Sequence, residues 1–163
     1  MLHFFNLQPQ NYDAMRKSII NTRPYLVLLL TCPVIALIAW LRRDYSADLQ
    51  LYDTWIAMKI PFLAGVLIAS ILLSGLAYWL TKRRAGFPQL AAMHVLGTIG
   101  IALYLVSATG MPPQAAEYIP TPMSVNRYQA WQDLTLRFAI GLVTFTAIQM
   151  ILIANLVVKW VKG

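Results

Sequence analysis

The sequence predicts an all-α integral membrane protein, a bundle of four transmembrane helices with both termini in the cytoplasm. Two observations predict this class. Of 163 residues, 59% are hydrophobic and only 12% are charged, whereas a soluble domain carries about 25% charged residues. Several stretches also reach the roughly 20 apolar residues that a helix needs to cross the hydrocarbon layer. We therefore expect a single membrane domain over residues 1–163.

The expected spans follow the stretches that lack Lys, Arg, Asp and Glu. These uncharged stretches are residues 24–41, 60–80, 90–108 and 138–158. We expect helices at about 24–41, 55–80, 90–108 and 136–158, with an outer loop at 110–135. The first stretch follows 23 polar-rich residues and precedes LRRDYS. It lacks the small-residue cleavage site of a secretory signal, so it is expected to remain as a span.

The basic residues predict the orientation of the bundle. If the N-terminus is inside, eight Lys and Arg lie on the inner side and five on the outer side. Lys and Arg near span ends are retained in the cytoplasm, and the Lys82-Arg83-Arg84 cluster gives the clearest signal. We expect a multi-pass protein of a bacterial-type inner membrane. The net charge of +7 then reflects topology and attraction to anionic lipid rather than nucleic-acid binding.

Few polar side chains in the spans could contact a cofactor. His94 can bond to a carbonyl near the inner interface or contribute a ligand to a shared site, and Gln149 can bond to a neighbouring helix or touch a quinone head group. Cys32, beside Pro33, suits a buried position at a kink, with a thiolate ligand as the alternative. Only one other histidine, His3, is present. No catalytic or metal-ligating residue is assigned, and haem or quinone is expected only at an interface with another subunit.

Small residues mark the expected helix contacts. Such residues let helix backbones approach closely in lipid. The face expected to pack against a partner consists of Gly65, Ser70, Ser74, Gly97 and Gly141.

Two motifs resemble the C-terminal four helices of the catalytic subunit (subunit I) of haem-copper (cytochrome c) oxidases. In that family one helix opens with Leu-His-Asp-Thr-Tyr, and an outer loop two helices later reads Gly-Met-Pro-Arg-Arg, followed by a Tyr-Pro pair and a Trp. This chain has Leu-Tyr-Asp-Thr-Trp at 51–55, Gly-Met-Pro at 110–112, Tyr118 and Trp131. The resemblance implies a four-helix piece with cytoplasmic ends and the Gly-Met-Pro loop outside.

The departures from that family concern its redox centre. Continuing the register from Asp53 places the family's two metal-binding histidines at Ile60 and Phe62, neither of which can bind a metal. Tyr52 replaces another family histidine, and residues 113–114 (Pro-Gln) replace the arginine pair. The third span also reaches Gly-Met-Pro about five residues early.

The resemblance implies a non-catalytic accessory subunit or assembly factor of a respiratory oxidase-type membrane complex. Its partners would be other membrane subunits and lipid, and its stiff, proline-rich outer loop would dock or cap the bundle. A small haem- or quinone-binding redox subunit is the alternative, and a small homo-oligomeric transporter ranks last. The loop residues expected to dock are Met111, Pro112, Tyr118 and Trp131.

Overall fold

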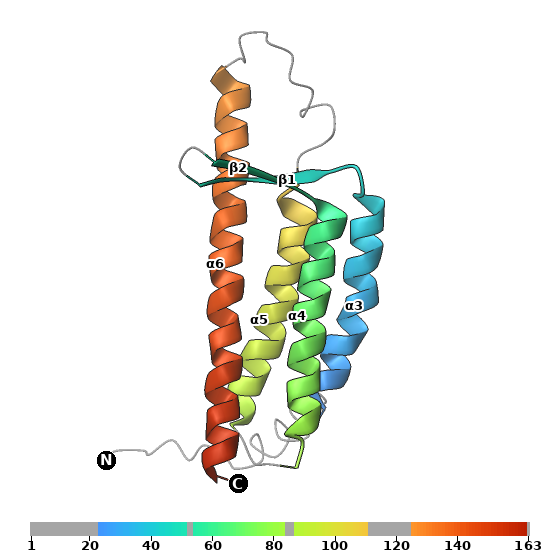
Figure 1. Ribbon diagram of the computed structural model, residues 1–163, viewed down its shortest axis with the longest axis vertical. Helices are drawn as coiled ribbons and strands as arrows, with labels where there is room; N and C mark the ends of the chain where they lie inside the picture. The colour runs from blue at the N-terminus through green and yellow to red at the C-terminus, as the bar shows by residue number, and fades with distance from the viewer. Residues whose placement is uncertain (1–22, 52–53, 84–86, 111–124, 163) are drawn as a thin grey trace, which may run out of the picture.

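The computed structural model describes residues 23–51, 54–83, 87–110 and 125–162. Most of these residues are helical, and the long helices run beside one another as a bundle (Figure 1). Each is long and apolar enough to cross a membrane, as expected for a multi-pass membrane protein. The helices are α3 (Pro24–Leu41), α4 (Ile60–Leu80), α5 (Pro88–Ala108) and α6 (Val125–Lys162).

Prolines lie at the beginnings of three helices. Pro24 and Pro88 open α3 and α5, and Pro61 lies in the first turn of α4. A proline fits there because its fixed φ suits a helix and the first turn leaves its N–H groups unpaired in any case. Pro33 lies inside α3, which nevertheless continues to Leu41.

A β-hairpin interrupts the expected all-α fold. Strand β1 (Ser46–Leu51) pairs in antiparallel fashion with β2 (Thr54–Lys59), in a register that runs from Ser46 opposite Lys59 to Leu51 opposite Thr54. The second span therefore begins at Ile60, and the prediction that it begins at about residue 55 is wrong. Figure 1 shows the hairpin lying across one end of the helices.

Alternating polarity explains why this segment forms strands. Polar residues at 46, 48 and 50 alternate with apolar residues at 47, 49 and 51, which is the period of a strand with two different faces. Ala47 is fully buried. At the base of the hairpin, the Ile60 backbone N–H donates to the Tyr45 carbonyl over 3.0 Å. The hairpin is thus anchored where α4 begins.

Helix α6 is longer than expected and contains part of the predicted outer loop. It begins at Val125 rather than near 136, and its 38 residues reach about 57 Å, well beyond a hydrocarbon layer of about 30 Å. In Figure 1 it continues past the hairpin. No proline follows Pro122 to stop it. Trp131 and Phe138 are buried on one face of this helix, so apolar packing continues beyond the uncharged stretch.

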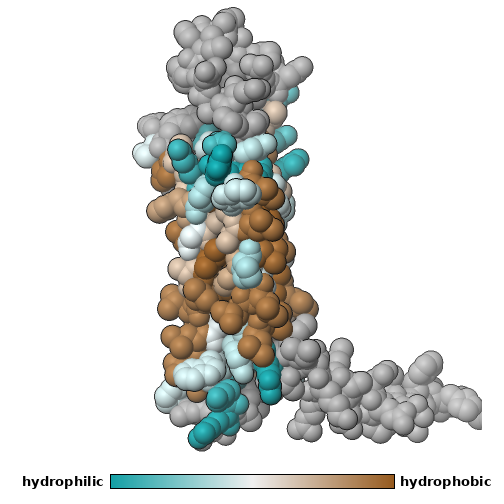
Figure 2. All heavy atoms as spheres, turned by 90° about the vertical axis from the view of Figure 1, so that its right-hand side faces the viewer, coloured by the Kyte–Doolittle hydropathy of each residue, from teal (hydrophilic) through white to brown (hydrophobic). Residues whose placement is uncertain are grey.

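The helices pack in pairs and leave a large apolar outer surface. The closest pairs are α3 with α4 and α5 with α6, and α3 also contacts α5. Large apolar side chains such as Leu30, Val143 and Val161 are mostly exposed. Figure 2 shows this apolar surface over the middle of the helices, with polar residues towards both ends. Such a surface suits contact with lipid or with other membrane helices.

Candidate functional site

His94 lies in the interior of the bundle. Its ring, on α5, is fully buried. Nδ1 lies 3.3 Å from the Tyr78 hydroxyl of α4, and Nε2 lies 3.3 Å from Gln149 Oε1 of α6. The expected carbonyl partner is thus replaced by side chains from two other helices, and His94 joins α4, α5 and α6.

Further polar side chains extend the contacts around Gln149. The Gln149 amide group donates to Thr98 Oγ1 over 3.4 Å, and the Ser74 hydroxyl donates to Gln149 Oε1 over 3.1 Å. Thr98 Oγ1 also lies 3.3 Å from His94 Nε2. These distances are at the long end of the normal range, and they connect residues from three helices.

One arrangement of protons satisfies the two ring nitrogens of His94. A neutral imidazole has one donor and one acceptor. The carbonyl oxygen of Gln149 can only accept, so Nε2 carries the proton, while Nδ1 accepts from the Tyr78 hydroxyl. Because both nitrogens face protein groups, the ring suits hydrogen bonding.

A second group of polar residues lies closer to the end of the bundle opposite the hairpin. Lys159, which is 8% exposed, donates from Nζ to Thr81 Oγ1 over 3.3 Å. Its ammonium also lies 5.1 Å from the centre of the Tyr78 ring, a distance that permits a cation–π interaction. Tyr78 therefore contacts both Lys159 and His94.

Asn155 is the least satisfied residue of this interior. It lies one turn before Lys159 on α6 and is fully buried. Although it is close to Tyr78, neither its Oδ1 nor its Nδ2 makes a hydrogen bond of normal geometry to the described residues. A buried polar group without a partner costs about 1–3 kcal/mol. A water molecule or a small polar ligand between the helices would satisfy it.

We call these residues the polar seam, because they line the boundary where α4, α5 and α6 meet. The arrangement can donate, accept and relay hydrogen bonds over several turns of helix inside an otherwise apolar bundle. Its members are Ser74, Tyr78, Thr81, His94, Thr98, Gln149, Asn155 and Lys159.

The seam suits a haem ligand poorly. For His94 to bind iron, one ring nitrogen would have to give up Tyr78 or both Gln149 and Thr98. Cys32 lies on α3, where its Sγ is 3.6 Å from the Leu28 carbonyl. Within the described part of the chain, no group of three His, Cys, Asp or Glu residues could hold a metal ion.

The predicted partner-packing face does not form one surface. Ser74 and Gly141 are buried within the chain, and a Cβ at Gly97 would lie 3.0 Å from Ile148. Gly65 instead faces outward, with no atom within 4 Å of a Cβ placed there, and Ser70 is half-buried. Most of these small residues therefore serve packing between helices of this chain.

The outer-loop predictions are only partly covered by the structure. Met111, Pro112 and Tyr118 lie outside the described residues. Trp131 lies on α6 rather than in a loop, and it is only 8% exposed. Its predicted role in presenting a docking surface is therefore corrected, because its ring is buried in this chain.

The oxidase-like motif at 51–55 also has a different setting from the expected one. Leu51 ends β1, Thr54 and Trp55 begin β2, and residues 52–53 lie outside the description. Ile60 and Phe62, at the positions of the family's histidines, have opposite surroundings. Ile60 is fully buried, whereas Phe62 is 65% exposed.

No protein-family model, curated protein or solved structure matches this chain. What is established is a membrane-type helical bundle with a terminal β-hairpin and a polar seam.

Sequence reasoning identified some seam residues but not their association. Ser74, Tyr78, His94, Gln149 and Asn155 were recognised as polar positions within spans. Thr98 and Lys159 were missed, although each follows another seam residue by four positions on one helical face. That spacing was the available signal.

Proposed function

We propose that this protein is a non-catalytic accessory subunit or assembly factor of a respiratory oxidase-type complex. The proposal extends the resemblance at 51–55 and 110–112 and places the chain in a bacterial-type inner membrane. The observation that carries it is the free face of α6. Only 17% of the most apolar part of Gln129–Val161 is buried, which is the lowest share among the candidate spans.

The free face of α6 has a form that suits another helix. Exposed Val143, Met150 and Val157 recur every seven residues, and Ala147 and Ala154 lie beside them on the same face. Heptad spacing keeps an apolar seam directed at a partner helix, and small residues allow the two backbones to approach. A partner subunit would therefore pack along this face.

Copurification tests this proposal. The tagged protein is extracted in mild detergent, and the eluate is examined for oxidase by its reduced-minus-oxidised haem spectrum and by the mass of the complex on a native gel. Wild type is expected to bring oxidase with it, and the double variant Ala147→Phe/Ala154→Phe is expected to lose it. Ala36→Phe, on the exposed face of α3, is the matched control.

Two results would contradict the proposal. If oxidase is absent from the wild-type eluate, the assignment to a respiratory complex is wrong. If the α6 variant keeps as much oxidase as Ala36→Phe, another face makes the contact.

We also propose that both termini lie in the cytoplasm, which places the hairpin outside. On a Cys32→Ser background, Thr54→Cys should react with a membrane-impermeant maleimide in intact cells. Lys82→Cys should react only after permeabilisation. The reverse labelling pattern would invert the topology.

One observation favours a second function, a small quinone-binding redox subunit. The buried Asn155 amide has no hydrogen-bond partner of normal geometry among the described residues, and a quinone carbonyl would accept a hydrogen bond from its Nδ2. Solvent extraction of the purified protein followed by chromatography would show quinone in proportion to the chain. Asn155→Leu should then lose the quinone, whereas Ile153→Leu, at an exposed position, should keep it. A Soret band with a full complement of haem would instead indicate a haem subunit.

A further inference from the structure

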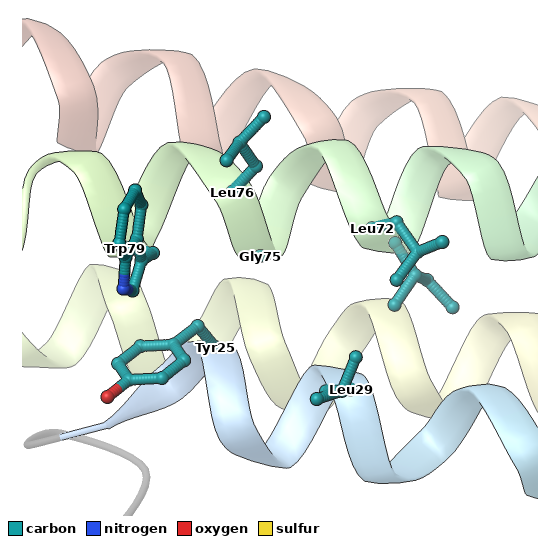
Figure 3. Close-up of a pocket in the computed structure, with 7 residues that line it drawn as sticks. Tyr25, Leu29, Leu72, Gly75, Leu76 and Trp79 are labelled. Atoms are coloured by element: carbon teal, nitrogen blue, oxygen red, sulfur yellow. The ribbon is translucent and has the colours of Figure 1, made fainter.

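A groove between α3 and α4 lies outside the polar seam. It encloses ≈ 230 Å³ and is lined almost entirely by apolar atoms. Figure 3 shows Leu29 and Leu72 towards one end of the groove and Tyr25 and Trp79 towards the other. The groove thus has an aliphatic part and an aromatic part.

Gly75 keeps the middle of the groove open. A Cβ at this position would meet only the Tyr25 carbonyl oxygen, at 3.9 Å. The groove therefore has room for an alanine at position 75, whereas a larger side chain would enter the space that Leu29 and Leu76 border.

Basic side chains surround the aromatic end. The Lys82 ammonium lies 5.2 Å from the centre of the Trp79 ring. Arg83 is exposed beside it, and Arg23, exposed at the start of α3, precedes Tyr25 by two residues. Since α3 begins where α4 ends, these cations lie at the same end of the bundle.

The charge at this end differs from that at the hairpin end. Among the residues whose side chains are described, the acidic ones are Asp44, Asp48 and Asp133, and all three lie at or near the hairpin. The described cations near the groove mouth therefore have no carboxylate beside them. An anion at the mouth would be attracted without competition from these acidic groups.

We propose that this groove is a binding site for one anionic phospholipid of the membrane. An acyl chain lies along Leu29, Leu72 and Gly75, and the phosphate lies at the mouth near Lys82 and Arg83. Tyr25 and Trp79 stand between the two, at the depth where aromatic residues meet lipid head groups. The charge at the mouth selects an anionic lipid, and the inference does not depend on an oxidase partner.

Native mass spectrometry of the purified full-length protein tests the site. The protein is delipidated in detergent and titrated with phosphatidylglycerol or phosphatidylcholine of identical acyl chains. Phosphatidylglycerol is expected to bind more tightly, and each basic side chain removed should weaken it about fivefold. Lys82→Gln and Arg83→Gln remove charge at the mouth, and Arg43→Gln, exposed at the other end, is the control.

The groove itself is tested separately from the charge. Gly75→Leu should weaken binding of phosphatidylglycerol, and Gly75→Ala should retain most of it. Equal affinity for the two lipids, or an unchanged affinity after the double change Lys82→Gln/Arg83→Gln, would overturn the proposal. So would unchanged binding in a folded Gly75→Leu protein. If Gly75→Leu does not fold, the two exposed charge variants still decide the question.

Discussion

The guanidinium group of Arg42, just after α3, donates a hydrogen bond of 2.8 Å to the carbonyl oxygen of Val106, near the end of α5. The same group also bonds to the carbonyls of Ser107 and Gly110, and it lies 4.4 Å from the centre of the Tyr45 ring. The last carbonyls of a helix lack partners within the helix. Arg42 therefore caps α5 and ties it to the base of the hairpin.

Loss of this cap should destabilise the bundle. Arg42→Gln removes a charged donor that reaches three carbonyls, and hydrogen bonds to charged groups contribute about 1.5–3 kcal/mol each. We expect the free energy of unfolding in detergent to fall by about 2 kcal/mol, measured by thermal or denaturant unfolding.

Arg43→Gln is the matched control for Arg42. The Arg43–Asp44 pair is 3.8 Å apart and solvent-exposed, and such pairs contribute little. If the two variants unfold alike, the capping role of Arg42 is wrong.

Two glycines should respond differently to alanine. A Cβ at Gly141 would lie 2.6 Å from Leu105 Cδ2, inside the packed boundary of α5 and α6. Gly141→Ala should lower the melting temperature, because the fully buried Leu105 must change rotamer at a cost of about 1–3 kcal/mol. Gly100→Ala meets no atom within 4 Å and should leave the melting temperature unchanged or raise it. Equal effects would place the contact between α5 and α6 elsewhere.

The contact between His94 and Gln149 predicts a result for two substitutions together. Gln149→Leu leaves the His94 Nε2–H without its acceptor and should reduce stability in detergent by about 1 kcal/mol. His94→Phe combined with Gln149→Leu should cost less than the sum of the single changes, since both polar partners are then gone. Additive effects would mean that the two side chains do not interact. Met150→Leu, at a mostly exposed site, is a neutral control.

Cysteine pairs can test the hairpin directly. Asp48 and Ala57 are opposite one another in the antiparallel register, where Cβ atoms are about 4.5–5.5 Å apart. On a Cys32→Ser background, Asp48→Cys/Ala57→Cys should form a disulfide on mild oxidation, seen as a mobility shift that reductant reverses. Asp48→Cys/Ile56→Cys places the thiols on opposite faces and should not. Efficient bridging of the second pair alone would shift the register.

Local sequence predicted some helix boundaries well and others poorly. The end of α3 at Leu41 and the end of α5 at Ala108 coincide with the ends of uncharged stretches. The start of α6 did not, because absence of charge reports on contact with hydrocarbon, whereas a helix continues into water as long as its backbone and one apolar face are satisfied. Trp131 supplies that face outside the expected span.

The hairpin shows a different limit. Its alternation of polar and apolar residues was present in the sequence, but the likeness of 51–55 to a helix start favoured the wrong element. Two strands are stable only when packed against another surface, and here β1 packs against α6, far away in the sequence.

The sequence by itself determined that this is a membrane-type bundle, because crossing hydrocarbon requires long apolar helices and these can be recognised within a single stretch of chain. Only the tertiary structure decided which polar residues meet. His94, Tyr78 and Gln149 belong to three separate helices, and whether such groups form hydrogen bonds or stay apart depends on the rotation and depth of each helix. Those quantities are set by packing between helices, which residues close together in the sequence do not encode.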